Sequence, residues 1–226
     1  MKVEQHLSEL LAAILPHVVF DGWSQTSFDC AVADLTMDPA FAAMIAPRGA
    51  LDLAVAYHRQ GDADMRAAYQ SSSAASLKIR EKITLAVRLR LEAIADKEAV
   101  RRATSLFALP HHVGEGASLI WGTADQIWDV LSDGSRDVNW YSKRATLSAV
   151  YGATVLFWLG DESPGHVATW AFLDRRIENV MQIEIAKAKI RDNKPLTAAL
   201  AGPLWLLGKI KAPQTRDDLP GRASKF

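Results

Sequence analysis

The sequence predicts an all-α protein of nine or ten helices joined by short connections. Three features of the 226-residue chain support this fold class. The alternation of apolar and polar residues that is typical of strands is nearly absent. Alanine, leucine and arginine, which favour helices, recur at the three- and four-residue spacing of amphipathic helices. Clusters of proline, glycine and aspartate interrupt these stretches at short intervals, as expected of turns between helices.

The first quarter of the chain predicts four short helices. Pro16 and the turn at Gly22 end the first of them, because proline removes a backbone donor and glycine favours a turn. Ser24 or Ser27 suits the N-cap of the second helix, and Asp38 followed by proline suits the start of the third. Gly61 follows the fourth. The predicted helices cover residues 3–15, 24–35, 38–46 and 50–59.

The rest of the chain predicts five longer helices and one apolar C-terminal element. The breaks between them are Pro110, the Asp-Gly-Ser turn at 133–135 and the polar segment 160–163. Lys194 and Pro195 precede the apolar element, and the chain from Pro213 onward is predicted as a frayed tail. The predicted helices cover residues 74–95, 97–109, 113–131, 140–159 and 164–191.

The composition of the chain argues against several broad classes of protein. The 26 lysines and arginines equal the 26 aspartates and glutamates, which argues against a globally basic nucleic-acid binder. The single cysteine, Cys30, excludes an internal disulfide framework and a cysteine-rich zinc site. Charge is unevenly distributed, however: residues 187–226 carry nine basic and three acidic side chains. The N-terminus lacks the features of a secretory or transit peptide, so we expect a cytoplasmic protein.

The predicted helices at 24–35 and 38–46 have the proportions of a helix-turn-helix, which would suggest a transcriptional regulator. DNA binding requires cations that neutralise phosphates. Between residues 21 and 47 the chain carries four aspartates and no lysine or arginine. We therefore predict a degenerate helix-turn-helix that does not bind nucleic acid. A regulator that binds a hydrophobic effector is retained as the alternative function.

No catalytic or cofactor motif is recognisable, and we predict no catalytic residue, no metal site and no cofactor. Nucleotide-binding loops and the nucleophile elbow of hydrolases are absent from the sequence. His111, His112 and Glu115 form the only cluster that suggests a metal. Adjacent histidines point to different sides of a helix, so the favoured interpretation is the start of a helix, with Glu115 interacting with its dipole.

Two segments of the later helices suggest binding sites. Trp140 and Tyr141 adjoin a polar turn, and neighbouring residues on a helix cannot both face one core. This segment is interpreted either as an interaction surface or as a helix start with one aromatic packed. Large and small apolar residues also mix on these helices, which predicts either a packed core or an elongated cavity for a lipid. The predicted cavity residues are Ile120, Ala124, Trp128, Leu147, Tyr151 and Val155.

The C-terminal segment 195–210 combines apolar residues with flanking cations. As a helix, residues 195–208 span about 21 Å, which is shorter than the ~30 Å hydrocarbon core of a bilayer. Such a segment is typical of a helix that lies on an anionic membrane surface. Docking on the protein's own core or on a second subunit is the alternative. The predicted membrane-facing residues are Leu196, Leu200, Leu204, Trp205, Leu207 and Ile210.

The later helices also carry a family resemblance. Residues 108–178 resemble the accessory proteins of coenzyme Q (ubiquinone) biosynthesis, which are lipid-binding relatives of TetR-type regulators. The resemblance rests on Ala-Leu-Pro-His at 108–111, Ala-Asp-Gln-Ile-Trp at 124–128, Asp-Val-Asn-Trp-Tyr-Ser-Lys-Arg-Ala at 137–145 and Thr-Trp-Ala-Phe-Leu at 169–173. The segment His-Val-Val-Phe-Asp-Gly-Trp-Ser at 17–24 is similar to bacterial members.

The resemblance implies a TetR-like fold, a homodimer without DNA binding, and a pocket for an isoprenoid quinone precursor or a phospholipid. It also implies a partner, the hydroxylase that acts late in ubiquinone synthesis, and membrane engagement through the last helix. The implied partner-binding patch consists of Asp137, Asn139, Trp140, Tyr141 and Arg144.

Together these observations predict a non-enzymatic accessory protein that presents a prenylated quinone precursor to a membrane-associated hydroxylase. We expect it to be peripheral on the cytoplasmic face of the inner membrane. The predicted organisation is a degenerate helix-turn-helix subdomain at 1–48, a helical lipid-binding domain at 49–192, and an amphipathic membrane helix with a tail at 193–226.

Overall fold

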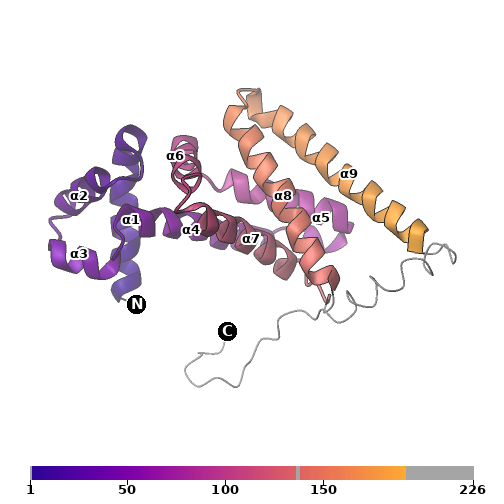
Figure 1. Ribbon diagram of the computed structural model, residues 1–226, viewed down its shortest axis with the longest axis horizontal. Coiled ribbons are helices and arrows are strands. Elements are labelled where there is room, and N and C mark those ends of the chain that lie inside the picture. The colour runs from indigo at the N-terminus through magenta and orange to yellow at the C-terminus, as the bar shows by residue number, and fades with distance from the viewer. Residues whose placement is uncertain (1, 136–137, 192–226) are drawn as a thin grey trace, which may run out of the picture.

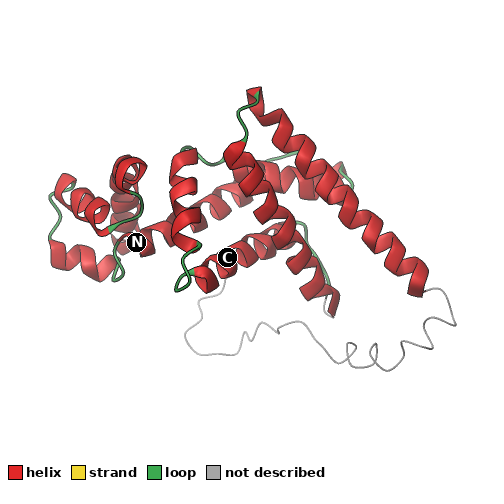
Figure 2. Ribbon diagram, turned by 45° about the horizontal axis from the view of Figure 1, so that its top comes forward, coloured by secondary structure: helices red, strands yellow, loops and turns green. Residues whose placement is uncertain are grey.

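The structure, a computed structural model, describes residues 2–135 and 138–191 and shows an all-helical protein, as the sequence predicts (Figure 1). Helices α1–α3 gather at one end, and α4 leads from them into the larger body formed by α5–α9. Short loops join the helices (Figure 2). The α-helices are α1 (Lys2–Asp21), α2 (Gln25–Asp34), α3 (Pro39–Ile45), α4 (Ala50–Gln70), α5 (Ile79–Glu92), α6 (Lys97–Phe107), α7 (Val113–Val130), α8 (Val138–Gly160) and α9 (Val167–Arg191).

Two hydrophobic cores hold the described part of the chain together. The smaller core lies between α1, α2, α3 and the start of α4, around residues such as Leu10, Ile14 and Leu53, which are fully buried. The larger core lies between α4, α5, α7, α8 and α9. Trp23 connects α6 to the smaller core, since its indole Nε1 donates to the Ala99 carbonyl at 3.0 Å. The fold therefore separates an N-terminal three-helix unit from a larger helical body.

The predicted N-caps of the two short helices are confirmed. The Ser24 hydroxyl accepts from the Ser27 backbone N–H at 3.2 Å, and the Asp38 carboxylate accepts from the Phe41 N–H at 2.9 Å. Of the two serines that the sequence offered as a cap, Ser27 instead donates its hydroxyl to the Gly22 carbonyl at 2.7 Å. Such caps depend on residues within one turn of the helix, so local sequence is sufficient to predict them.

The predicted end of the first helix at Pro16 is wrong, because α1 continues through this proline to Asp21. Proline removes one intrahelical hydrogen bond from the turn before it. Val18 lies one turn beyond Ile14 on the same face, and both side chains are fully buried in the smaller core. Burial of this additional turn offsets the missing hydrogen bond.

The fourth helix is also longer than predicted, since α4 passes Gly61 and ends at Gln70. Met65 and Tyr69 extend its buried face into the larger core. Gly61 itself is fixed by a close approach to Arg90. A Cβ atom at position 61 would lie within 3.0 Å of three atoms of the Arg90 guanidinium, so any larger residue here would displace the guanidinium from its present position.

Three predicted helix starts shift by a few residues. Helix α5 begins at Ile79 instead of residue 74, because a 3₁₀ turn at Ala74–Ser76 precedes it and the Glu81 carboxylate accepts from the Lys78 backbone N–H at 2.8 Å. Helix α8 begins at Val138 instead of residue 140. Helix α9 begins at Val167, after a 3₁₀ turn in which Gly165 has a φ of +62°.

No single described helix is long and apolar enough to cross a bilayer, although α3 and α4 together, as a bent pair, have the length and composition of a membrane span. The predicted membrane segment at 195–210 lies outside the described residues.

Candidate ligand cavity and its polar cluster

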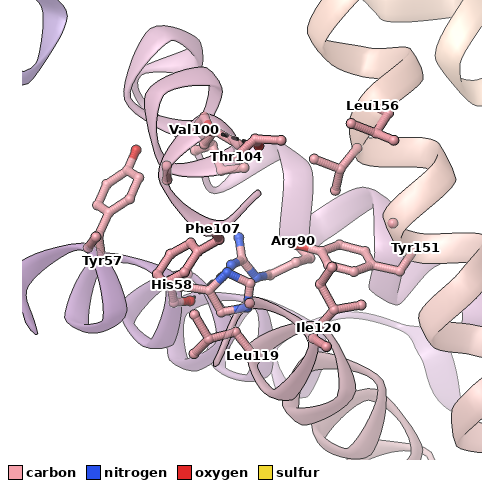
Figure 3. Close-up of a pocket in the computed structure, with 18 of the residues that line it drawn as sticks. Tyr57, His58, Arg90, Val100, Thr104, Phe107, Leu119, Ile120, Tyr151 and Leu156 are labelled. Atoms are coloured by element: carbon pink, nitrogen blue, oxygen red, sulfur yellow. Dashed lines mark hydrogen bonds between the residues drawn. The ribbon is translucent and has the colours of Figure 1, made fainter. Parts of the chain in front are cut away.

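A cavity of about 480 Å³ opens between α4, α6, α7 and α8 (Figure 3). Its size falls in the range of ligand pockets. Most of its wall is apolar, and one side is closed by Arg90 of α5 and by Ala93 and Ile94, which follow that helix. Val113 and Leu156 line it too and are 55% and 62% exposed, which places them where the cavity meets solvent. Further lining residues include Ala54, Tyr57, Phe107, Leu119, Ile120 and Val155.

A cluster of five polar side chains lies at one wall of this cavity. We call Arg90, Asp62, His58, Thr123 and Tyr151 the polar cluster. Arg90, His58 and Tyr151 line the cavity, whereas Asp62 and Thr123 lie behind them. The structure thus combines an apolar cavity with a small set of polar groups, an arrangement that orients ligands in many binding sites.

Arg90 is the centre of the polar cluster and is only 3% exposed. Its Nε donates to Asp62 Oδ1 at 2.6 Å, and its Nη2 donates to the His58 carbonyl at 2.9 Å. The Thr123 hydroxyl donates to the same Asp62 oxygen at 2.9 Å. Since that hydroxyl proton is used on Asp62, the contact of 2.8 Å between His58 Nε2 and Thr123 Oγ1 is best satisfied with the imidazole as donor.

The polar cluster is electrically neutral as a whole. Arg90 and Asp62 form a buried ion pair, and burial together with the nearby Arg90 cation lowers the pKa of His58 to about 4, so this imidazole is uncharged at neutral pH. Burial raises the pKa of the Tyr151 phenol, which therefore stays protonated. Burial alone would lower the pKa of Arg90, but the neighbouring Tyr151 and Asp62 raise it above its ordinary value.

The lowered pKa of His58 predicts that the protein loses stability in mild acid. Between pH 6.5 and about 4, the unfolded chain binds a proton at this histidine that the folded protein does not bind. The free energy of unfolding should therefore fall as the pH falls through this window, by about 1.4 kcal/mol per pH unit from His58 alone. Urea unfolding at pH 7 and at pH 5 measures the loss.

The matched variants for this experiment are His58→Gln and His111→Gln. His58→Gln removes the titrating group and should flatten the pH dependence, whereas His111, which is exposed, should leave it unchanged. An equal slope in the wild type and in His58→Gln would contradict this assignment.

The six predicted cavity residues divide among three places. Ile120, Tyr151 and Val155 line the cavity described above. Trp128 and Leu147 line a second cavity, also of about 480 Å³, between α5, α7, α8 and α9. Ala124 is fully buried in the larger core and belongs to neither lining.

Sequence reasoning missed the polar cluster. Arg90 belongs to a run of cations on α5 that is typical of a solvated helix face, although helical spacing places it on the apolar stripe of Ile83 and Val87 and directs exposed Arg88 away from that stripe. A second signal lies on α4, where Gly61 and Asp62 stand together inside a helical stretch. Glycine in a helix interior is unfavourable, so it often marks a close approach of another group.

The second cavity has a partly polar wall. Trp128 is 8% exposed, and its indole Nε1 has no hydrogen-bond partner among the described residues. Lys143 lies over the same indole ring at 5.1 Å and donates to Asp133 at 2.7 Å. Ile79, the first residue of α5, also lines this cavity and is 46% exposed.

The predicted partner-binding patch surrounds the start of α8. Asp137 lies outside the described residues, Asn139 is exposed, and Trp140 and Tyr141 are half-buried with ring centroids 4.8 Å apart. Arg144 is only 2% exposed. The two aromatics and Asn139 are therefore accessible at one surface, whereas Arg144 lies beneath it.

The contacts of Arg144 are internal to the protein. Its Nε donates to Asp125 at 2.5 Å, and its Nη1 lies 3.4 Å from Asp133. Its guanidinium carbon stands 3.9 Å from the centre of the Trp140 ring, a cation–π arrangement, and Nη1 also donates to the Trp140 carbonyl at 3.3 Å. Arg144 thus supports Trp140 from below.

The N-terminal unit carries the acidic helices that the sequence predicts. His17 pairs with Asp34 at 2.7 Å, and Met44 of α3 is 64% exposed at the surface where a helix-turn-helix would present basic side chains. Glu115, which the sequence placed near two histidines, instead accepts from Arg48 at 2.9 and 3.0 Å. The rings of His111 and His112 contact each other at 4.1 Å, and no group of metal-ligating side chains is found within the described residues.

Comparisons with known proteins agree with the predicted resemblance. Residues 113–184, which cover α7, α8 and much of α9, match the model of the COQ9 family. Human mitochondrial ubiquinone biosynthesis protein COQ9 is 39% identical over 82 residues, which are 36% of this chain and 26% of that protein. The rat protein of the same name is 30% identical over 188 residues, 80% of this chain. The chain thus spans 60% of the length of the rat relative.

A comparison of folds gives a TetR-type architecture. A crystal structure of the TetR transcriptional regulator from Nitrosomonas europaea superposes with a TM-score of 0.64 and 18% identity, covering 77% of this chain and 97% of that one. At this identity the likeness concerns the fold alone. It confirms the TetR-like architecture predicted for the helices.

Proposed function

We propose that this chain, which is similar to the COQ9 ubiquinone biosynthesis proteins, is a non-enzymatic, lipid-binding accessory protein of ubiquinone biosynthesis. The observation that carries the proposal is the apolar cavity of about 480 Å³ between α4, α6, α7 and α8. Transfer of an isoprenoid chain from water into such a cavity is favourable, by about 25 cal/mol per Å² of apolar surface. The ligand is a prenylated quinone precursor, or a phospholipid in its place.

Two further surfaces complete the proposed role. The half-buried aromatics Trp140 and Tyr141, together with Asn139, dock the hydroxylase that takes the precursor as substrate. Aromatic residues with accessible faces are common at the centres of protein interfaces.

Residues 195–210, outside the described part of the chain, bind the membrane through their apolar and cationic side chains. The names of the animal relatives place those proteins in mitochondria; for this chain we propose a homodimer, peripheral on the cytoplasmic face of the inner membrane.

The regulator alternative is less well supported. Its support is the TetR-like architecture, which shows the fold alone at 18% identity. Against it stand the four aspartates and the absence of lysine and arginine between residues 21 and 47. Non-specific affinity for DNA depends on cations that neutralise phosphates. A gel shift at low salt distinguishes the two functions, because only a regulator would bind operator DNA.

The lipid-binding proposal is tested by filling the cavity. Gly152 lines it, and a Cβ atom there meets only Ile120 at an ordinary 3.8 Å, so a larger side chain can enter the cavity. In Gly152→Trp we expect most of the lipid that copurifies with the wild type to be lost. Organic extraction of the purified protein followed by mass spectrometry measures the amount and identity of that lipid.

Gly122→Trp is the matched control for this experiment. Gly122 lies on α7, does not line the cavity, and has open space around its Cβ direction. This variant should retain the wild-type lipid content. Equal lipid in all three proteins, or none in any of them, would contradict the proposal that this cavity is the lipid site.

The membrane proposal is tested separately with charge substitutions in the C-terminal segment. We expect Leu204→Glu combined with Leu207→Glu to abolish most flotation with anionic vesicles, because carboxylates in the apolar face oppose insertion and are repelled by anionic lipid. Gln214→Glu combined with Thr215→Glu adds the same charge outside the segment and should have a smaller effect. Equal flotation of the two double variants would argue against membrane binding through 195–210.

A further inference from the structure

We propose that the cavity holds its ligand through a neutral oxygen atom, the carbonyl or hydroxyl of a ring on an isoprenoid chain, that accepts a hydrogen bond from Nη1 of Arg90. The inference rests on the proposed function and names the part of the ligand that the cavity recognises. It places the ring at the polar cluster, with the isoprenoid chain directed toward the exposed lining residues Val113 and Leu156.

The donor for this hydrogen bond is present and unused. A guanidinium carries five N–H groups. Nε of Arg90 bonds to Asp62 and Nη2 bonds to the His58 carbonyl, whereas Nη1 makes no hydrogen bond to any residue that the structure describes. Arg90 lines the cavity, and Figure 3 shows its guanidinium between His58, Phe107 and Tyr151. A ligand oxygen that reaches this group pairs with a donor that the described residues leave unpaired at the cavity wall.

The position of Nη1 is fixed before a ligand arrives. Asp62 and the His58 carbonyl hold two corners of the guanidinium at 2.6 and 2.9 Å. The third nitrogen, Nη1, lies against Gly61, which also lines the cavity. Because glycine has no side chain, it leaves room for Nη1. A donor that is already oriented loses little conformational entropy on binding, so its hydrogen bond contributes more fully to affinity.

The charges around Arg90 favour a neutral acceptor over an anion. Asp62 already compensates the positive charge of Arg90 at 2.6 Å, and the neighbouring imidazole of His58 is uncharged at neutral pH. A phosphate at this wall would introduce a second negative charge without a buried counterion, and burying such a charge is unfavourable. A quinone carbonyl or a phenol hydroxyl accepts the same hydrogen bond without this cost.

The experiment compares three probes that carry the same geranyl chain: geranyl-benzoquinone, geranylbenzene and geranyl phosphate. Binding to the full-length protein is measured by isothermal titration in one detergent. We expect the wild type to bind the quinone at least about tenfold more tightly than geranylbenzene, which has the same ring without the oxygens, because a hydrogen bond from a charged donor is worth this much or more. The phosphate should bind more weakly than the quinone.

Arg90→Lys tests the residue itself. Lysine keeps a positive charge opposite Asp62 but lacks the forked guanidinium. We expect the preference for the quinone over geranylbenzene to disappear, with the affinity for geranylbenzene unchanged. Arg80→Lys, at a half-exposed ion pair with Glu178, is the matched control and should retain the preference. Circular dichroism verifies that both variants are folded.

Each outcome separates this inference from the proposed function. Equal affinity of the wild type for the quinone and for geranylbenzene overturns the inference while leaving lipid binding intact. This comparison uses the wild-type protein alone. If geranyl phosphate binds more tightly than geranyl-benzoquinone, the ligand is an anion and the proposal of a neutral acceptor is wrong. An unchanged preference in folded Arg90→Lys excludes Arg90 as the donor. If none of the three probes binds to the wild type, the proposed lipid-binding function itself fails.

Discussion

Replacing Asp62 by leucine should lower the free energy of unfolding by about 3–5 kcal/mol, the typical cost of removing one partner of a buried ion pair. Arg90 is 3% exposed, and Asp62 accepts both its Nε–H and the Thr123 hydroxyl. Without the carboxylate, the guanidinium stays buried with an uncompensated charge, and the Thr123 hydroxyl keeps only its longer contact of 3.3 Å to the Leu119 carbonyl. Urea unfolding followed by circular dichroism measures the change.

Two controls make this result specific to burial. Glu178→Leu removes the carboxylate partner of Arg80, a pair whose side chains are 42% and 43% exposed, and should cost less than about 1 kcal/mol. The double variant Asp62→Leu with Arg90→Met removes both charges and should recover a large part of the loss. A cost below about 1 kcal/mol for Asp62→Leu, equal to that of the Glu178 control, would refute the role of the buried pair.

The second large effect is expected at Arg144, where substitution by methionine should lower the free energy of unfolding by about 2–3 kcal/mol. This is less than the full cost of breaking a buried pair, because Lys143 still compensates Asp133 and because Asp125 is partly exposed. The same substitution removes the cation that lies 3.9 Å from the Trp140 ring. If the proposed hydroxylase docks at Trp140, we expect this substitution to weaken its binding as well.

A pull-down with the hydroxylase, combined with urea unfolding, separates the two roles. Trp140→Ala should abolish most partner binding at a smaller loss of stability, because Trp140 is half-buried and forms the accessible surface. Arg175→Met, at an exposed arginine of α9, should change neither property. Unchanged partner binding in Trp140→Ala would remove the evidence for the docking surface. Wild-type stability in Arg144→Met would show that its ion pairs are dispensable.

The cavity residues predicted on α7 and α8 line two different cavities in the structure. Ile120, Tyr151 and Val155 share one cavity, whereas Trp128 and Leu147 belong to another, although the sequence predicts a single cavity for all five. Periodicity identifies which residues share a helix face. It carries no information about which of two neighbouring cavities that face meets, because this depends on the angles between helices.

Arg144 illustrates the same limit in the partner-binding patch. The family resemblance implies that Arg144 belongs to a surface patch together with Trp140 and Tyr141. The structure places its guanidinium against Asp125, Asp133 and Trp140, with 2% exposure. The acidic partners lie at the end of α7 and in the following turn. Whether an arginine reaches solvent or such partners is decided by packing between helices, which the sequence of one helix does not contain.

The sequence by itself determined the all-helical class, the caps at Ser24 and Asp38, and the acidic character of the N-terminal unit. These features depend on interactions within one or two helical turns and on composition. Only the tertiary structure decided that α1 passes Pro16, that α4 passes Gly61, and that Arg90 is buried beside a cavity. Asp62 precedes Arg90 by 28 residues, and the pair exists only because α4 and α5 pack together, which buries two charges that each helix alone would leave in water.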